Sequence, residues 1–425
     1  MSSPLPQGYY AASAGPGHPY PRLTGSSATE VCVIGGGYTG LSAALHLAEA
    51  GAQPVLLEAE TIGFGASGRN GGQIHTGLRW DQQDLEAWLG AQHARDLWNL
   101  TEESKSLVRT LVERHAIACA LKDGLVIAAH NARALKHLVA DTAHLAQHYG
   151  YDAARMMDAD ESAEKLGTRV YPGARLDLGG GHLHPLAYAR GLAMAADRAG
   201  APLWEHSPAL SLTGTRDNIE VRCAAGTVMA KRVLIACDAF SASIAPQLAP
   251  YIAHVESFIV ATPPLPPHLS DSVLPSDTAV ADTRHVLDYY RKSADRRLLF
   301  AGRETYFNPP KDIAALVRPR MLDVFPQLED TPIEFAWSGS VGITCTRMPH
   351  FGDLSDRIQF AHGYSGQGVA LATLGGKLLA EAALGQRERF EVFARVPAKK
   401  FPGGRWLRKP MVAAALYAFK VLDAM

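Results

Sequence analysis

Three glycines near the N-terminus have the spacing of a nucleotide-binding turn. In the run Gly-Gly-Gly-Tyr-Thr-Gly, Gly35 makes the tight turn, Gly37 lets the backbone approach a pyrophosphate, and Gly40 lets the following helix pack closely. That helix begins with free N–H groups and a partial positive charge, which attract phosphate. Glu58 follows at about the 20-residue distance expected of a ribose-binding carboxylate, with a solvated strand-end charge as the alternative. The expected dinucleotide contacts are Gly35, Gly37, Tyr38, Thr39, Gly40, Glu58 and Ala59.

A second glycine-rich loop, residues 63–73, has the sequence GFGASGRNGGQ. Nicotinamide-dependent dehydrogenases continue from the first unit into another βαβ unit, whereas a loop of this kind can wrap an extended FAD. Ser67 can donate to the pyrophosphate, Arg69 adds positive charge, and the small residues let backbone N–H groups approach a flavin ring. A flexible surface loop is the alternative. The expected contacts are Ala66, Ser67, Arg69, Asn70, Gly71, Gly72 and Gln73.

A third segment near the C-terminus also leads from a strand into a helix. Residues 357–361 form the expected strand, residues 362–368 read HGYSGQG, and the expected helix runs to about Leu384. A helix start aimed at the flavin N1 and C2 carbonyl would stabilise the negative charge that builds up there on reduction. A purely structural turn is the alternative. The expected contacts are Gly363, Gly366, Gln367 and Gly368.

These three segments, in this order and spacing, resemble the D-amino-acid-oxidase-type FAD oxidoreductases, a family that includes glycine, sarcosine and amine oxidases. The similarity extends to Tyr9 and Tyr10, to the run GGGHLHPLAYARGLA at 179–193, and to the tail FPGGRWLRKP, so it covers nearly the whole chain. Within the family it is greatest to the gamma-glutamylputrescine oxidoreductases, on the second loop and the tail.

The resemblance implies positions for further cofactor contacts. Ala209 and its neighbours are expected to meet the adenine, and residues 236–238 (Ala-Cys-Asp) replace the family's Ala-Thr-Gly turn near the FAD. Some relatives attach the flavin covalently to a cysteine or histidine. Cys345 lies in the corresponding region, but we expect a buried structural cysteine and a non-covalent FAD.

One departure from the family bears on the substrate. Amino-acid oxidases of the family carry an arginine shortly before an Asp-Gly-x-Pro turn, and its guanidinium grips the substrate α-carboxylate in a bidentate pair. Val341 stands at that place here. Arg291 or Arg303 could substitute, or each is a solvated strand charge. The change favours an amine over an α-amino acid.

Four other side chains are candidates for the substrate pocket. His75 follows the second loop and either borders the flavin or is structural. Tyr289 and Tyr290 alternate along a predicted strand, so one of them should face the cavity. Trp337 either walls the pocket or packs in the core. No side-chain base is demanded by the sequence, so no certain catalytic residue is named.

Composition excludes several other classes of protein. The 425 residues carry 41 basic and 42 acidic side chains, which argues against a nucleic-acid partner. The five cysteines have no CxxC spacing, and the pair His182 and His184 has no evident third ligand, so we expect a reducing compartment and no metal. No apolar run approaches the roughly 20 residues of a membrane span, and residues 1–23 lack the features of a secretion signal, which predicts a cytoplasmic protein.

The elements that must position these residues predict two interleaved domains. Residues 30–34, 38–50 and 54–58 read as strand, helix and strand, the βαβ unit of a doubly wound fold. Residues 85–115 and 132–149 read as helical, residues 233–236 as a strand that returns to the first sheet, and residues 411–422 as an apolar helical stretch. Later short strands around the proline-rich loop 263–267 indicate a mainly antiparallel sheet that floors the pocket. We therefore expect an α/β, Rossmann-like FAD-binding domain interleaved with an α+β substrate domain. The predicted segments are an N-terminal arm (1–27), the FAD-binding domain (28–84, 155–240 and 335–390), the substrate domain (85–154 and 241–334), and a basic tail with a C-terminal helix (391–425).

The resemblance implies the reaction. A primary amine such as gamma-glutamylputrescine, an intermediate of polyamine catabolism, would pass a hydride to flavin N5, and reoxidation by O2 would give aldehyde, ammonia and H2O2. The alternative is a dehydrogenase of D-amino acids or secondary amines that passes electrons to a quinone, with the basic tail in peripheral contact with the membrane. A flavin-binding protein without turnover is a third reading. The sequence leaves the oligomeric state open.

Overall fold

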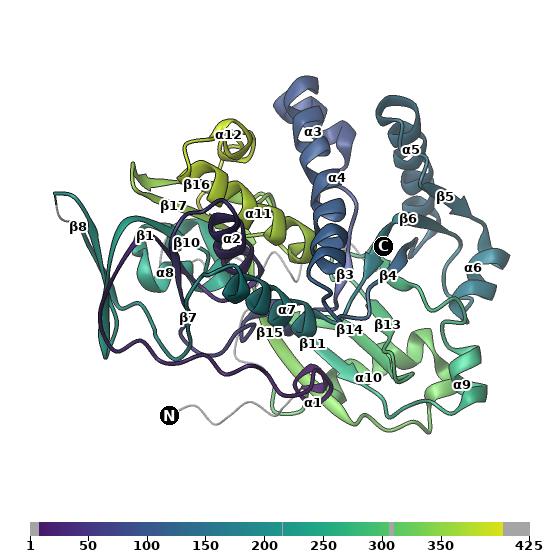
Figure 1. The fold of residues 1–425 in the computed structure, drawn as a ribbon. Coiled ribbons are helices and arrows are strands. Elements are labelled where there is room, and N and C mark those ends of the chain that lie inside the picture. The colour runs from purple at the N-terminus through teal and green to yellow at the C-terminus, as the bar shows by residue number, and fades with distance from the viewer. Residues whose placement is uncertain (1–7, 215, 306–309, 403–425) are drawn as a thin grey trace.

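The computed structural model describes residues 8–214, 216–305 and 310–402, which build two sheets with helices packed on their faces (Figure 1). The helix expected at 411–422 and most of the basic tail lie outside these residues. The twelve helices of the described residues are α1 (Tyr9–Ser13), α2 (Tyr38–Glu49), α3 (Gln82–Leu89), α4 (Ala91–Arg114), α5 (Ala132–Tyr149), α6 (Ala159–Leu166), α7 (Pro185–Arg198), α8 (Ser241–Ile244), α9 (Pro267–Ser272), α10 (Ile313–Val324), α11 (Gly368–Ala383) and α12 (Glu388–Ala394).

The first sheet is built on parallel strands. In spatial order it contains β16 (His350–Ser355), β17 (Ile358–His362), β10 (Gly226–Ile235), β1 (Gly25–Ile34), β2 (Pro54–Leu57) and β7 (Leu203–Trp204), with β9 (Ile219–Arg222) and β8 (Ser211–Gly214) extending from β10. Strands β17, β10, β1, β2 and β7 are parallel neighbours. Strand β16 pairs antiparallel with β17, and β9 pairs antiparallel with β10. The return of residues 233–236 to this sheet, expected from the sequence, is confirmed by the pairing of β10 with β1.

The second sheet is mainly antiparallel. In spatial order it contains β15 (Phe335–Thr344), β11 (Ile252–Ala261), β14 (Leu298–Thr305), β13 (Tyr289–Lys292), β12 (Ala279–Asp282), β4 (Lys122–Ala128), β6 (Ala174–His182) and β3 (Gln73–Ile74), with β5 (Ala154–Met157) paired to β6. Strands β5, β6 and β15 lie in segments that we assigned to the FAD-binding domain. Strand pairing places them here, because β6 pairs with β4, β5 pairs with β6, and β15 pairs with β11.

Burial explains why the central strands of the first sheet read as apolar runs. All four residues of β2 and the last four of β1 are buried, as expected for parallel strands covered on both faces. On one face α2 packs between α7 and α11, with α4 against α11 (Figure 1). On the other face the strands pack against β9 and the 241–248 segment.

The helix ends follow local sequence signals. Asn131 caps α5 by accepting the N–H of Ala134 at 2.8 Å, and Gly150 ends it in the left-handed conformation. The helical pattern that we expected from about 85 to 115 is two helices, because Gly90 takes φ +87° and breaks it into α3 and α4.

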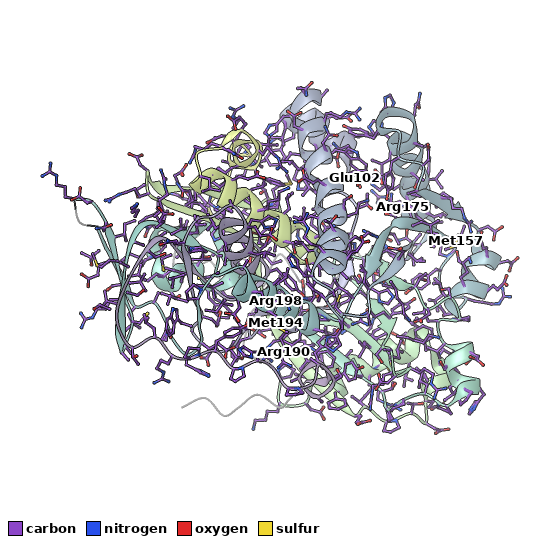
Figure 2. All side chains as sticks on the ribbon, in the orientation of Figure 1. Glu102, Met157, Arg175, Arg190, Met194 and Arg198 are labelled. Carbon is purple, nitrogen blue, oxygen red and sulfur yellow. The ribbon has the colours of Figure 1, made fainter. Side chains whose placement is uncertain are left out.

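Helix α7 shows how one helix separates solvent from core. Arg190, Met194 and Arg198 recur every four residues and lie on its outer face (Figure 2), while Tyr188 and Leu192 are fully buried against α2 and α4. Among the described residues, no helix combines the length and apolarity needed to cross a membrane.

Candidate active site

A cavity of about 440 Å³ is lined by residues of both sheets. One part, which we call the glycine half, consists of the lining residues within 35–39, 64–73 and 364–369. The other, which we call the strand wall, consists of the lining residues of β11, β13, β14 and β15 together with Arg79 and Arg347. The cavity therefore lies where the parallel sheet and the antiparallel sheet both contribute side chains.

Only glycine fits the first turn of the glycine half. Gly35 has φ +115°, and a Cβ there would lie 2.5 Å from the carbonyl oxygen of Ala236. A Cβ on Gly40 would lie 1.8 Å from the carbonyl oxygen of Gly35. Because the obstructing atoms are backbone, neither contact can be relieved by a side-chain movement. Gly40 thus allows close packing of α2 on the turn, behind the cavity surface.

The N-terminus of α2 opens into the cavity. Its N-cap residue, Gly37, provides no side-chain cap. The Tyr38 N–H donates to Ser67 Oγ at 3.0 Å, which leaves the Ser67 hydroxyl hydrogen available to a ligand. Glu58 accepts the N–H of Gly36 at 2.6 Å, and burial raises the pKa of its carboxyl group in spite of this bond. Backbone donors and one carboxylate therefore face the same space.

Side chains of the second loop hold the loop in shape. The Asn70 amide donates to the carbonyl oxygen of Ala66 at 2.9 Å and accepts the N–H of Gly72 at 2.7 Å. Arg69 Nε donates to the carbonyl oxygen of Phe64 at 2.7 Å. The sequence suggested that Arg69 and Asn70 contact a cofactor; both line the cavity, and both also close the loop on itself.

The second sheet anchors the same loop from outside. Arg291 Nε donates to the carbonyl oxygen of Gly71 at 2.7 Å, and Trp337 Nε1 donates to that of Arg69 at 3.0 Å. Gln73 Nε2 donates to a carbonyl oxygen of β12 at 2.8 Å. The guanidinium of Arg291 is therefore engaged in positioning the loop.

Asp238 joins the strand wall to the start of α11. Its carboxylate accepts the N–H of Gly363 at 2.8 Å and that of Gly342 at 3.0 Å. It stands in the family's Ala-Thr-Gly turn at the place of the glycine, with φ +42°, so the departure supplies the side chain that fixes this corner. Beyond it, the N-cap residue Gln367 provides no side-chain cap, and Gly366 has φ +95° with open space where a Cβ would lie.

This arrangement fits FAD. Two helix starts whose N-cap residues provide no side-chain cap, those of α2 and α11, face one cavity, and helix N-termini bind anionic groups. The first would hold the pyrophosphate, and the second the flavin edge that becomes negative on reduction. Cys237 also lines the cavity, but burial raises the pKa of its thiol to about 12, which keeps it protonated and unsuited to a covalent flavin link.

Most of the residues expected to contact the cofactor line the cavity. These are Gly35, Gly37, Tyr38, Thr39, Glu58, Ala59, Ala66, Ser67, Arg69, Asn70, Gly71, Gln73, Ala209, Gly366 and Gly368. Four others lie behind its surface: Gly40, Gly72, Gly363 and Gln367. Gly72 and Gly363 are tightly packed, since a Cβ would lie 2.0 Å from the carbonyl oxygen of Leu183 and 2.3 Å from the Thr344 methyl group respectively.

Of the aromatic residues expected in the pocket, Tyr289 lines the cavity, and Tyr290 and Trp337 do not. Tyr289 lines the cavity and its hydroxyl lies 3.1 Å from Ser257 Oγ, whereas Tyr290 stacks on Phe300 in the core with ring centroids 5.4 Å apart. The two tyrosines thus face opposite sides of the sheet, as their alternation predicts. Trp337 packs against the N-terminal arm rather than the cavity.

Val341 occupies the centre of the wall. It lines the cavity and pairs directly with Val255 on β11, which also lines the cavity. Ile343 and Ile259 extend this apolar surface on the same two strands. An α-carboxylate placed here would therefore find methyl groups instead of a guanidinium.

Sequence reasoning missed two cationic residues of the cavity, Arg79 and Arg347. Arg79 precedes α3, and Arg347 lies in the turn between β15 and β16. Burial and the nearby Arg347 lower the pKa of Arg79 to about 10, while Glu304, which also lines the cavity, favours its charged form. Arg79 lies in no recognisable motif, Arg347 lies in the segment that corresponds to the family's Asp-Gly-x-Pro turn, and only the fold brings them together.

His75 lines the cavity as a neutral imidazole. Burial, with a smaller contribution from Arg79, lowers its pKa to about 4. At neutral pH the ring therefore keeps one nitrogen free to accept a hydrogen bond.

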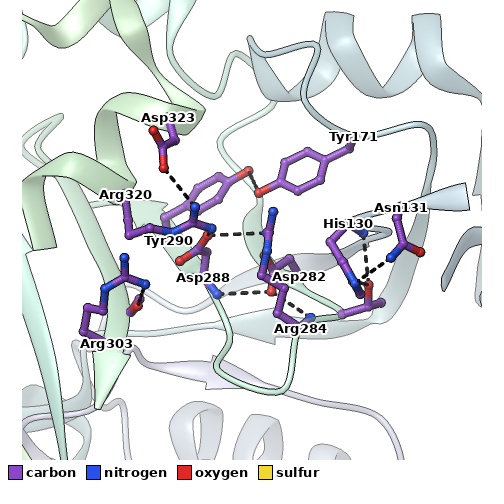
Figure 3. A network of polar contacts seen from close by, with 12 residues as sticks. His130, Asn131, Tyr171, Asp282, Arg284, Asp288, Tyr290, Arg303, Arg320 and Asp323 are labelled. Atoms are coloured by element: carbon purple, nitrogen blue, oxygen red, sulfur yellow. Dashed lines mark hydrogen bonds and ion pairs between the residues drawn. The ribbon is translucent and has the colours of Figure 1, made fainter. Parts of the chain in front are cut away.

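A buried ion-pair network supports the loop between β12 and β13 (Figure 3). Arg284 pairs with Asp282 and, at 3.4 Å, with Asp288, and Arg320 of α10 also pairs with Asp288. Burial raises the pKa of both aspartates. Since residues 285–287 line the cavity, the network fixes part of its wall.

The described residues contain no cluster of three or more metal-binding side chains. His182 and His184 do not act as a pair: one ring lies 3.3 Å from the carbonyl oxygen of Asp277, and the other lies 3.0 Å from Ser13 Oγ. Cys345, expected to be buried, is exposed, because it sits in the turn after β15.

Comparisons with known proteins agree with this geometry. A family model described as FAD dependent oxidoreductase (DAO) matches residues 30–382. Gamma-glutamylputrescine oxidoreductase of Escherichia coli is 40% identical over 416 residues, covering 97% of each chain. The probable oxidoreductase OrdL of Haemophilus influenzae is 38% identical and covers 98% of this chain and 96% of its own.

Solved structures share the fold at lower identity. The glycine oxidase of Geobacillus kaustophilus superposes with a TM-score of 0.72 at 22% identity, covering 85% of this chain and 95% of that one. The L-proline dehydrogenase of P. horikoshii gives a TM-score of 0.71 at 20% identity, covering 84% and 93%.

Proposed function

The chain belongs to the D-amino-acid-oxidase-type family of FAD-dependent oxidoreductases, and we propose that it oxidises a primary amine such as gamma-glutamylputrescine. The carbon that bears the nitrogen loses two electrons and two protons to give an imine, which water converts to an aldehyde and ammonia. O2 takes up the two electrons and two protons and becomes H2O2. The observation that carries this proposal is Val341, which faces the cavity where amino-acid oxidases of the family bear an arginine.

Bound FAD supplies the two-electron acceptor for this reaction. The chain's own contribution begins with holding that group. The uncapped start of α2, with the Ser67 hydroxyl, faces the position suited to the pyrophosphate, and Glu58 faces that suited to a ribose. The start of α11, fixed by Asp238, contributes the donors that stabilise negative charge on the reduced ring.

The strand wall would orient the amine. Val255, Val341 and Ile343 provide an apolar surface, and burial on such a surface favours the neutral amine, the form that can be oxidised. The neutral ring of His75 can accept an N–H of that amine. Burial raises the pKa of Tyr289 to about 12, so its hydroxyl stays protonated and remains a donor.

An anaerobic reduction experiment tests the proposal. The purified holoenzyme is mixed with gamma-glutamylputrescine, putrescine, glycine, sarcosine or D-alanine, and flavin absorbance is followed by stopped flow. We expect rapid bleaching with gamma-glutamylputrescine and slow or no bleaching with the amino acids. If no polyamine derivative bleaches the flavin, the proposed substrate class is wrong.

The same reduced enzyme identifies the electron acceptor. Mixing it with O2 should restore the oxidised spectrum and yield one H2O2 per aldehyde. Reoxidation by a quinone but not by O2 would instead favour the dehydrogenase alternative. Acid precipitation tests attachment of the cofactor, since a yellow supernatant is expected of non-covalent FAD.

A further inference from the structure

We propose that Arg79 and Arg347 form a binding site for a carboxylate that the substrate carries at the end remote from its reacting amine. The inference rests on the proposed function and adds a second recognition group to it. The predicted ligand has three parts: the reacting primary amine, an apolar chain next to it, and a carboxylate that is not on the carbon bearing the reacting amine.

A hydrogen bond brings the two arginines into one part of the cavity. Trp80 Nε1 donates to the carbonyl oxygen of Thr346 at 2.6 Å, which ties the segment before α3 to the turn between β15 and β16. Arg79 and Arg347 are the immediate neighbours of these two residues, and both line the cavity. Burial, and after it the charge of Arg347, lowers the pKa of Arg79, as expected of a cation beside another cation in a partly desolvated space.

Neither guanidinium has an acceptor among the residues that the structure describes. Over residues 8–214, 216–305 and 310–402, the side chains of Arg79 and Arg347 make no hydrogen bond and no ion pair. Glu304 favours the charged form of Arg79 by electrostatic attraction, without a hydrogen bond or ion pair between them in the described structure. Cations removed from water are costly unless an anion pairs with them. Two adjacent, unpaired guanidiniums in a ligand cavity therefore match a carboxylate supplied by the ligand.

The backbone of Arg347 supports a role for its side chain. Its φ is +58°, in the left-handed region that non-glycine residues seldom adopt. Glycine would occupy this position without strain. The turn thus carries a strained arginine whose side chain makes no bond within the described protein, a combination typical of ligand-binding positions.

Arg303, the third arginine of the strand wall, differs from Arg79 and Arg347 in the partners that the protein offers to its side chain. Its guanidinium donates to the carbonyl oxygen of Gly302 at 3.3 Å. Burial and Arg320 lower its pKa, whereas Asp288 and Asp323 favour its charged form, and it lies beside the ion-pair network of Arg320 (Figure 3). The protein itself therefore offers Arg303 compensating negative charge. Arg303 serves as a matched comparison: a cavity arginine of the same size and charge without the proposed role.

The apolar side chains of β11 and β15 indicate where the chain between the amine and the carboxylate would lie. Val255 and Val341 are paired across β11 and β15, and Ile343 continues the strip toward the turn that bears Arg347. An apolar chain lying along these residues would leave its carboxylate at the two guanidiniums. The planar guanidinium fork pairs with carboxylate in a bidentate manner, which lysine does not reproduce.

Paired substrates and variants test the inference. The substrates are gamma-glutamylputrescine and 4-aminobutanoylputrescine, which lacks only the carboxylate; the variants are Arg79→Met, Arg347→Met, Arg347→Lys and Arg303→Gln. We expect the wild type to prefer the carboxylate-bearing substrate in kcat/KM by roughly 10- to 100-fold. Arg79→Met and Arg347→Met should abolish most of that preference while changing kcat/KM for 4-aminobutanoylputrescine by less than about 3-fold. Arg347→Lys should retain part of it, and Arg303→Gln should alter both substrates to the same degree.

The outcomes separate this inference from the proposed function. If neither substrate bleaches the wild-type flavin, the proposed function fails and the subsite fails with it. If both bleach it equally well, the amine oxidation stands and the carboxylate site is wrong. Equal losses on both substrates in Arg79→Met and Arg347→Met would also overturn it, because that result indicates a structural role.

A second measurement uses only wild-type enzyme, so it tests the inference even if the variants do not fold. Gamma-glutamylbutylamide carries the carboxylate but lacks the amine of the putrescine end. 4-Aminobutanoylbutylamide lacks that amine and the carboxylate, and keeps only the amine of its acyl end. With wild-type enzyme, the first should inhibit competitively and perturb the flavin spectrum, and the second should bind at least about 10-fold more weakly. Equal inhibition by the two compounds would contradict the inference.

Discussion

The two halves of the cavity are built on different principles. The glycine half presents backbone N–H groups from three short runs, each continuous in sequence, and its side chains largely hold the loops together. The strand wall presents side chains from β11, β13, β14 and β15 and from two separate turns. The binding properties of the glycine half thus depend on having small residues at given positions. Those of the strand wall depend on which side chains face the cavity.

This difference indicates where each half tolerates change. Where the backbone does the binding, a single added side chain obstructs the ligand and no neighbouring residue can compensate. Where side chains do the binding, replacement alters preference among ligands while the cavity persists. Substitutions in the glycine half should therefore affect occupancy by FAD, and substitutions in the strand wall should affect choice of substrate.

The largest effect is expected of Gly37→Val. Gly37 has φ −90°, which valine can adopt, but its Cβ would lie 2.8 Å from Ser67 Oγ at the open start of α2. We expect FAD affinity to fall by more than about 100-fold, measured by titrating apoprotein with FAD. Gly214→Val is the matched control, because a Cβ there meets no atom within 4 Å and the residue lies on β8, away from the cavity. Unchanged affinity in Gly37→Val would contradict backbone recognition.

Acidification should lower the stability of the folded protein through one buried histidine in each sheet. Burial lowers the pKa of His182 in the second sheet and of His362 in the first to about 3, against about 6.5 when unfolded. Because the unfolded chain binds protons first, stability is lost as pH falls from about 6.5 toward 3. For two groups the loss at pH 5 is up to about 4 kcal/mol relative to pH 7.

Calorimetry of the apoprotein at pH 7, 6 and 5 would measure this loss. His182→Gln and His362→Gln should each remove part of the pH dependence. A Tm that is unchanged between pH 7 and 5 would show that these two rings are not neutral in the folded protein.

Val341→Arg should shift the substrate preference of the enzyme toward α-amino acids. The new guanidinium would face the cavity beside Val255, where a bidentate pair with an α-carboxylate can form. We expect the rate of anaerobic flavin bleaching by glycine or sarcosine to rise by roughly 10- to 100-fold. Val341→Met adds similar length without charge and should give no such gain. FAD content should be unaffected in both variants.

Tyr289→Phe should have the smallest effect. It removes a hydroxyl that lies 3.1 Å from Ser257 Oγ but leaves the ring in place. A net hydrogen bond is worth about 1 kcal/mol, so kcat/KM should fall about 2- to 5-fold. Tyr290→Phe, in the core, should leave kcat/KM unchanged and lower only Tm. Equal kinetic effects of the two changes would argue against the strand alternation.

Local patterns predicted the parallel part of the fold well. The βαβ unit around Gly35, the capped helix 132–149 and the strand that returns at 233–236 all occur where the apolar spacing and glycines indicated. The helical pattern at 85–115 was divided by Gly90, a position that spacing alone did not mark. Strands β5, β6 and β15, in or at the edge of the segments 155–240 and 335–390 that we assigned to the FAD-binding domain, pair in the second sheet, since antiparallel pairing joins strands far apart in sequence.

The sequence by itself determined the glycine half, because a turn that must admit a phosphate requires residues without side chains, and that requirement is written in consecutive positions. Only the tertiary structure decided the strand wall. Arg79 and Arg347 are separated by most of the chain and meet through one hydrogen bond between their neighbours, and Tyr290 turns into the core while Tyr289 faces the cavity. Side-chain recognition depends on which strands pair and in which register, and no local pattern encodes that.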